Sequence, residues 1–120
     1  MRCHIELIGF VAKAPEFRDL PNGDRHAILV IETREGWRDR ATGERRNRST
    51  WHDVRVTKAG VVKAIERTVT IGELVFVAGS LRYSDWTDAQ KVERRTAEIA
   101  VKSPEHQLIL LASPDTGPGG

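Results

Sequence analysis

The chain has 120 residues, of which 39% are hydrophobic and 30% charged, a composition typical of one folded domain and not of a disordered chain. No apolar stretch approaches the roughly 20 residues that cross a bilayer, and the N-terminal segment carries a charge within its only apolar run, which excludes a signal peptide. The net charge of +2 gives no strong overall preference for an anionic partner.

The first part of the chain predicts two strands separated by a turn. Residues 3–14 form a mixed apolar run with Gly9 inside it, which indicates a bulged or strongly bent strand. Pro15 and the cluster at residues 20–24 mark a turn region. Residues 26–35 are apolar enough at their centre to form a strand that is buried on both faces for part of its length.

The segment 36–49 holds an uneven share of the positive charge. It contains glycines and many arginines, so it is predicted to be a connection with its tip at residues 42–44. Between residues 34 and 48, six arginines face only three acidic residues, and this net charge of +3 leaves −1 for the rest of the chain. A local basic loop on a nearly neutral domain favours an anionic partner.

The next segment, 51–57, alternates between apolar and polar residues. Val54 and Val56 point to one side of this predicted strand, so Trp51 points to the other side, away from the core. His52 shares the side of the valines. A tryptophan that faces outward from a strand is unusual, because this side chain normally fills a core.

The second half of the chain predicts one helix and further strands. Residues 58–67 have the apolar spacing of a short amphipathic helix. Residues 74–86 form a strand with a bend at Gly79 and with Arg82 and Trp86 on one face. The remaining segments are a polar hairpin connection at 87–94, a strand at 96–102, a short last strand at 108–111 and a flexible end at 113–120.

Five bent strands with one short helix between the third and the fourth predict an all-β fold. Its closest match is a five-stranded Greek-key barrel of the oligonucleotide/oligosaccharide-binding (OB) type, spanning residues 1–112. All three tryptophans, Trp37, Trp51 and Trp86, stand among arginines and polar residues. Indole rings beside guanidinium groups can stack bases and attract phosphates, so the pattern predicts a surface for single-stranded nucleic acid.

Four motifs follow one another along the chain at spacings that resemble one known family. They are Leu-Ile-Gly at 7–9 with Pro-Asn-Gly at 21–23, Trp-Arg-Asp-Arg-Ala-Thr-Gly-Glu at 37–44, Thr-Trp-His at 50–52, and Gly-Ser-Leu-Arg followed by Trp-Thr-Asp within 79–88. This order is similar to that of the bacterial and mitochondrial-type single-stranded DNA-binding proteins, over residues 3–112. The resemblance implies an OB-fold subunit of a homotetramer, a dimer of dimers. It also implies sequence-independent, non-catalytic binding of single-stranded DNA in replication, repair or recombination, in the bacterial cytoplasm with the nucleoid.

The resemblance also implies roles for individual residues. Trp37, Trp51 and Trp86 take the places of stacking aromatics, and His52 takes that of a histidine near the subunit interface. The arginines expected to contact phosphates are Arg38, Arg40, Arg45, Arg46, Arg48, Arg55 and Arg82.

Two departures from the family pattern accompany this resemblance. A further aromatic residue usual in the family is replaced here by Thr57, or by Lys58 if one residue is inserted before it. Residues 113–120 lack the acidic tip through which the family recruits replication and repair enzymes, so recruitment by that route is not expected.

Neither a metal, a cofactor nor a catalytic residue is predicted. The four histidines are far apart without a cysteine or carboxylate at ligand spacing, and Cys3 is the only cysteine. No nucleophile with an adjacent base is visible, so we expect no enzyme. Two alternatives stay open: a primosomal-type OB-fold accessory that binds mainly protein or structured nucleic acid, and a small nuclease whose basic loop holds substrate.

Overall fold

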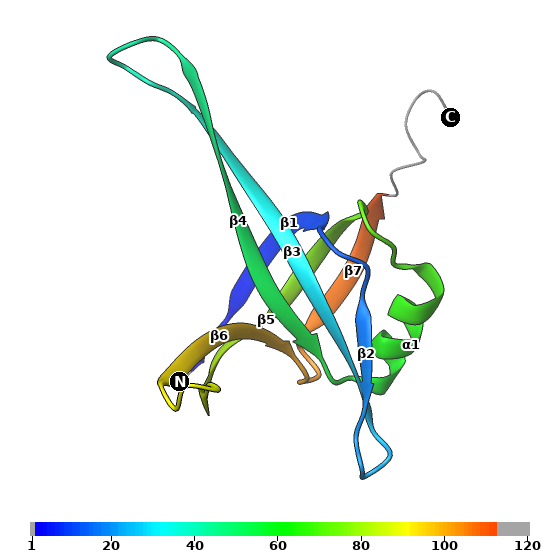
Figure 1. Cartoon of the computed structure of the whole chain (residues 1–120). Coiled ribbons are helices and arrows are strands. Elements are labelled where there is room, and N and C mark those ends of the chain that lie inside the picture. The colour runs from blue at the N-terminus through cyan, green and yellow to red at the C-terminus, as the bar shows by residue number, and fades with distance from the viewer. Residues whose placement is uncertain (1, 113–120) are drawn as a thin grey trace.

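The computed structural model describes residues 2–112. It is a small β-barrel with one helix packed against it and a long β3–β4 hairpin projecting from it (Figure 1). The elements of this part of the chain are β1 (Ile5–Val11), β2 (Glu16–Asp19), β3 (Arg25–Arg38), β4 (Arg45–Val56), α1 (Ala59–Thr68), β5 (Leu74–Thr87), β6 (Glu93–Val101) and β7 (Gln107–Ala112).

Five strands close the barrel in the order β1-β3-β4-β6-β5 and back to β1. β1 closes it, because residues 5–10 pair with β5 whereas Phe10 and Val11 also pair with β3. The predicted all-β OB barrel is confirmed, with α1 between the third and fourth barrel strands. β7, which corresponds to the last predicted strand, pairs with β5 next to the barrel. β2 pairs with β3 and is a short strand that the sequence did not predict.

The core is aliphatic and follows the two-residue period of the strands. On β3, Ala27, Leu29 and Ile31 are at most 1% exposed, and on β4 the same holds for Val54 and Val56. Their partners from the other elements form one cluster, which consists of Val11, Val62, Ile65, Val69, Val75, Val77, Ile99 and Val101. The burial of alternate residues therefore fixes which face of each barrel strand points outward.

Two pairs of strands continue beyond the barrel as hairpin arms. The β3–β4 ladder runs without interruption as far as Arg38 opposite Arg45, and the β5–β6 ladder runs as far as Thr87 opposite Glu93. The predicted connection at 36–49 is therefore wrong, because most of it is strand, whereas the predicted hairpin connection at 87–94 is confirmed, although it is shorter and spans only 88–92. Side chains on both faces of the arms are polar or exposed, so the apolar periodicity that indicates a strand is missing there.

Of two smaller expectations at the chain ends, one changes and the other is not tested. β1 begins at Ile5, and Cys3 precedes it and is exposed, so residues 3 and 4 do not belong to the first strand. The predicted flexible end, 113–120, lies outside the described residues.

Gly9 and Gly79 lie where a second strand passes close to the backbone. A Cβ at Gly79 would overlap the carbonyl oxygen of Ala100, and one at Gly9 would overlap that of Glu32. The pairing of β1 with β5 continues through Gly9 without a register shift, so of the two predicted alternatives, a bulge or a strong bend, the bulge is absent. Glycine is needed at these positions for close approach of the strands that close the barrel.

We expect Gly79→Ala to lower the free energy of unfolding by about 1–3 kcal/mol, because the added carbon forces the β5 and β6 backbones apart. Chemical denaturation measures the change. The matched control is Gly60→Ala in α1, where an added Cβ meets no atom within 4 Å and where alanine is the better helix former by up to about 1 kcal/mol. Equal stabilities of the two variants would contradict the close approach at Gly79.

Candidate nucleic-acid interface

Trp51 and Trp86 lie on the outward face of the barrel, as their strand parity predicted. Trp51 is 61% exposed, and its neighbours Val54 and Val56 fill the core. Trp86 is 49% exposed, and its indole Nε1 donates a hydrogen bond of 2.8 Å to Thr96 Oγ1 on β6. The Trp86 ring is thus held in one orientation with an open surface, which is what base stacking needs.

A row of charged residues joins these two tryptophans across the outward face. β6 lies between β4 and β5, and its Glu98 is cross-strand to Arg82 on β5. Arg55 on β4 donates from Nε to the same carboxylate at 3.4 Å, and also lies 3.3 Å from Nδ1 of His26. Arg55 and Arg82 therefore share the face of Trp51 and Trp86, and one carboxylate faces both.

His52 points to the inward side of β4, as predicted from its parity with the valines. Its Nε2 lies 2.9 Å from Thr33 Oγ1 on β3. A groove of about 320 Å³ passes this histidine and Trp51 and reaches Ile5 and Leu7 on β1. His52 is therefore part-buried near β1, on the side of β4 opposite to the Trp51 side chain.

Trp37 lies on β3 within the β3–β4 arm, and not on a loop. It is 43% exposed and lies directly across from Arg46, while the guanidinium of Arg48 stands over its ring at 5.8 Å from the centroid. Its parity is that of the buried Ile31, whereas Trp51 has the opposite parity. Trp37 and Trp51 therefore face opposite sides of the β3–β4 ribbon, and the three rings do not form one flat platform.

The predicted arginines divide between these two sides. Arg38 and Arg45 form the last pair of the β3–β4 ladder and share the face of Trp51, whereas Arg46 and Arg48 share the face of Trp37. Arg40 lies in the tip between the strands and is exposed. Both faces of the arm therefore present an indole ring together with guanidinium groups.

An aspartate organises the tip of each arm. Asp39 Oδ1 accepts a hydrogen bond from the backbone N–H of Ala41 at 2.8 Å, and Asp88 Oδ1 accepts from the backbone N–H groups of Gln90 and Val92, both at 2.9 Å. The Ala41 bond is the main cause that lowers the pKa of Asp39, and the Val92 bond is the main cause that lowers that of Asp88. An arginine adds to each shift.

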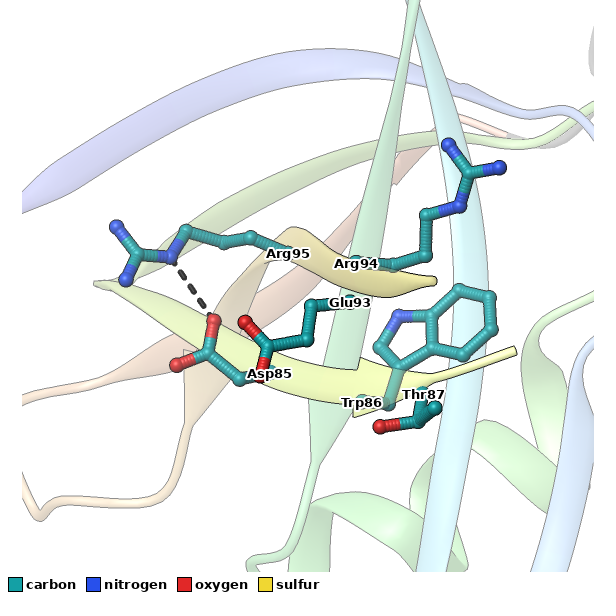
Figure 2. A pocket seen from close by; sticks show the side chains of 6 residues that line it. All are labelled: Asp85, Trp86, Thr87, Glu93, Arg94 and Arg95. Carbon is teal, nitrogen blue, oxygen red and sulfur yellow. Dashed lines mark hydrogen bonds and ion pairs between the residues drawn. The ribbon is translucent and has the colours of Figure 1, made fainter. Parts of the chain in front are cut away.

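The β5–β6 arm carries residues that the sequence interpretation missed. A pocket of about 390 Å³ lies at its outer end. Trp86 and Arg94 lie together in it, and Arg95 turns away from them to Asp85 (Figure 2). Tyr83 is 58% exposed beside Arg95, whose guanidinium is 5.7 Å from the ring centroid. The missing signal was the register that sets Trp86 opposite Arg94, which cannot be read once the segment is taken for a loop.

The place of the missing aromatic is used for structure. The Thr57 N–H donates to the carbonyl of Val101, and Lys58 Nζ donates to the carbonyl of His106 at 2.9 Å. Neither residue offers a ring to a base. Within residues 2–112 no cluster of histidine, cysteine and carboxylate side chains could hold a metal ion, and no helix is long and apolar enough to cross a membrane.

A profile of the single-strand binding protein family matches residues 3–107. The chain belongs to this family. Proteins of this family bind single-stranded DNA without catalysis, so the predictions of the family and of a non-enzymatic protein are confirmed.

Individual relatives agree with this membership. The single-stranded DNA-binding protein of Rickettsia felis is 39% identical over 107 residues, which are 89% of this chain and 70% of the relative. That of Rickettsia prowazekii is 39% identical over 105 residues, 88% of this chain and 69% of the relative.

Solved structures show the same fold. The Plasmodium falciparum protein in complex with single-stranded DNA superposes with a TM-score of 0.84 at 32% identity, covering 92% of this chain and 96% of that one. A deletion mutant of the Thermus aquaticus single-stranded DNA-binding protein gives a TM-score of 0.71 at 21% identity, over 92% of this chain and 51% of that one, and supports the fold alone.

The lowered pKa values of Asp39 and Asp88 predict how the arm tips respond to acid. A carboxylate with a lowered pKa keeps its stabilising bonds at and above the ordinary aspartate value of about 4, and loses them only as the pH falls further through its own pKa. The backbone amide signals of Ala41 and Val92 in an NMR titration should therefore change with midpoints below about 4.

Asp88→Asn is the matched control for that titration. It should abolish the pH-dependent change at Val92 and leave the change at Ala41, which depends on Asp39. Midpoints at or above the ordinary aspartate range would contradict the assignment.

Proposed function

We propose that this protein binds single-stranded DNA without sequence preference, by stacking bases on Trp37, Trp51 and Trp86 and by binding phosphates with the arginines beside them. The observation that carries the proposal is the exposure of all three indoles, between 43% and 61%, among guanidinium groups on a member of this family. Indole faces accept any base, and arginines follow a regular line of phosphates.

The two-sided arrangement of the rings sets the route of the strand. Trp51, Arg55, Arg82 and Trp86 share the outward face of the barrel, and the row at Glu98 connects them. Trp37 faces the other side of the β3–β4 ribbon, so a strand that also stacks on it has to pass around the arm. Wrapping of this kind suits a flexible single strand and not a stiff duplex.

A titration with oligo-dT, followed by tryptophan fluorescence, tests the proposal directly. We expect strong quenching that saturates, because stacked bases quench exposed indoles. Unchanged fluorescence of the folded protein at low salt would contradict the proposal, and would favour the accessory role on protein or structured nucleic acid. Cleavage of a labelled single strand in the presence of magnesium would instead favour a nuclease.

Stacking and phosphate binding should separate in two variants. Trp51→Ala should weaken binding by about 1–3 kcal/mol and leave the salt dependence unchanged, because it removes a ring and no charge. Arg45→Ala combined with Arg46→Ala should make the slope of log affinity against log salt shallower, by about 0.7 for each lost phosphate contact. The reverse pattern would mean that Trp51 has a structural role.

We further propose that the protein assembles as a homotetramer, a dimer of dimers. The outer faces of β1, β5 and β7 align Ile8, Phe76 and Ile109 in one row, with Phe10 beside it, and Ile8 and Ile109 are 56% and 44% exposed. An uncharged patch on three adjacent strands is typical of a protein–protein interface. In addition, residues 5–9 of β1 have no strand partner on the β3 side among the described residues, so a second β1 could pair there.

His52 lies in the groove beside this open edge, which supports its predicted place near a subunit contact. His52→Lys should therefore shift the assembly toward smaller species in light scattering, because it places a charge beside the contact. The control is Ala64→Lys on the exposed side of α1, which should leave the mass unchanged. An unchanged mass of the His52 variant at every concentration would contradict the assignment.

This function would place the protein with single-stranded DNA at the bacterial nucleoid, in replication, repair or recombination. Its contribution there is to protect and organise the strand, which requires no cofactor.

A further inference from the structure

The tip of the β3–β4 arm holds one arginine in a fixed position. Arg46 lies directly across the ladder from Trp37. Its Nε donates to Asp39 Oδ2 at 3.1 Å, while Asp39 Oδ1 accepts from the N–H of Ala41 within the turn. One carboxylate therefore ties the arginine to the turn. Arg46 is 52% exposed and has only one further partner among the described residues, Glu44 at 3.9 Å.

The tip of the β5–β6 arm repeats this arrangement. Arg94 lies directly across the ladder from Trp86, and its Nε donates to Asp88 Oδ2 at 3.0 Å. Asp88 Oδ1 accepts from the turn N–H groups of Gln90 and Val92. Within residues 2–112, Asp88 is the only recorded polar partner of the Arg94 guanidinium, which is 54% exposed.

The likeness of the two tips does not come from a shared turn. The connections differ in length and sequence, 39–44 in one arm and 88–92 in the other. In both, however, the aspartate stands two residues after the tryptophan and reaches across the turn to the arginine opposite that tryptophan. Because Nε is the atom that each aspartate engages, the terminal amino groups stay open to an oxygen ligand, except that Arg46 Nη2 lies 3.9 Å from a carboxylate oxygen of Glu44.

We propose that each arm tip is a phosphate-binding unit in which Arg46 or Arg94 binds the phosphate next to the base stacked on Trp37 or Trp86, and in which Asp39 and Asp88 are positioning residues. The inference rests on the proposed function and adds to it a DNA contact at Arg94 and a role for two acidic residues. The physical reason is preorganisation, since a side chain already held in its binding conformation loses less freedom when the ligand arrives.

If the aspartates are positioning residues, their removal should change the DNA affinity in the direction opposite to that expected from net charge alone. Removing a negative charge from a DNA-binding surface should strengthen binding if charge alone matters. Asp88→Asn keeps an oxygen for the turn N–H groups but presents an amide N–H₂ to Arg94, so it releases the arginine. We therefore expect Asp88→Asn to weaken oligo-dT binding about two- to tenfold at moderate salt.

The matched control is Asp85→Asn on the same arm. Asp85 pairs with Arg95 at 2.9 Å on the face opposite Trp86, so the charge change is identical but the arginine released is the one beside Tyr83, and Arg94 opposite Trp86 stays held by Asp88. This variant should bind DNA as tightly as the unaltered protein or more tightly. Thermal unfolding of both variants checks that the fold is kept.

A double-mutant cycle shows whether Asp88 acts through Arg94. Arg94→Ala should weaken binding and make the salt dependence shallower, and Asp88→Asn should cause no further loss in that background. A structural role of Asp88 alone would give the same loss in both backgrounds. The same pair of measurements applies to Asp39→Asn and Arg46→Ala on the other arm.

The outcomes separate the two proposals. If oligo-dT does not quench the tryptophan fluorescence of the unaltered protein, the proposed function fails and this inference fails with it. If it binds, but Asp88→Asn and Asp85→Asn strengthen binding alike, the function stands and the positioning role is overturned. Weaker binding by Asp88→Asn alone, absent in the Arg94→Ala background, supports the inference.

Discussion

The burial of one face of each barrel strand is the constraint on which the rest of the structure depends. Side chains alternate along a strand, so the positions of Val54 and Val56 in the core settle that Trp51 faces outward. The ladder then carries this choice beyond the core without a register shift, as far as the pair Trp37 and Arg46. A one-residue slip of β4 against β3 would turn Trp51 and the arginines of β4 to the wrong side, while Trp37 on β3 would stay where it is.

The arms have to be held by something other than a core. A two-stranded ribbon is marginal in water on its own, but each arm grows directly out of a ladder that the barrel has already fixed. At the far end of each arm the chain reverses direction. There Asp39 and Asp88 accept hydrogen bonds from backbone N–H groups that would otherwise have only water as a partner. The arms are thus ordered at both ends, by packing at the base and by side-chain hydrogen bonds at the tip.

Hydrophobic periodicity was enough to predict the barrel, the helix position and the outward tryptophans of β4 and β5. It failed at the arms, because segments such as 36–49 have no buried face and so lack the signal on which the prediction depends. The failure had a consequence for the site. Taking the segment around Arg94 for a loop hid the register opposite Trp86, and taking Trp37 for a loop residue hid that it faces away from Trp51. Residue types alone indicated a nucleic-acid surface, whereas its two-sided shape depends on pairings that no local pattern encodes.

The small net charge of the chain also has an explanation in these pairs. Several of the arginines that we propose as DNA contacts already pair with a carboxylate, as Arg55 does with Glu98 and Arg46 with Asp39. An ion pair as exposed as that of Arg46 contributes only about 0–1 kcal/mol, so it directs the side chain without holding it tightly, whereas the pair of Arg55 with Glu98 is part-buried. A single strand carries a closely spaced line of phosphates with bound counterions, and these counterions are released when arginines neutralise the phosphates. A lone carboxylate brings no comparable release. In the proposed arrangement Asp39 and Asp88 therefore orient the guanidinium groups through Nε and do not compete for the terminal amino groups that would bind a phosphate.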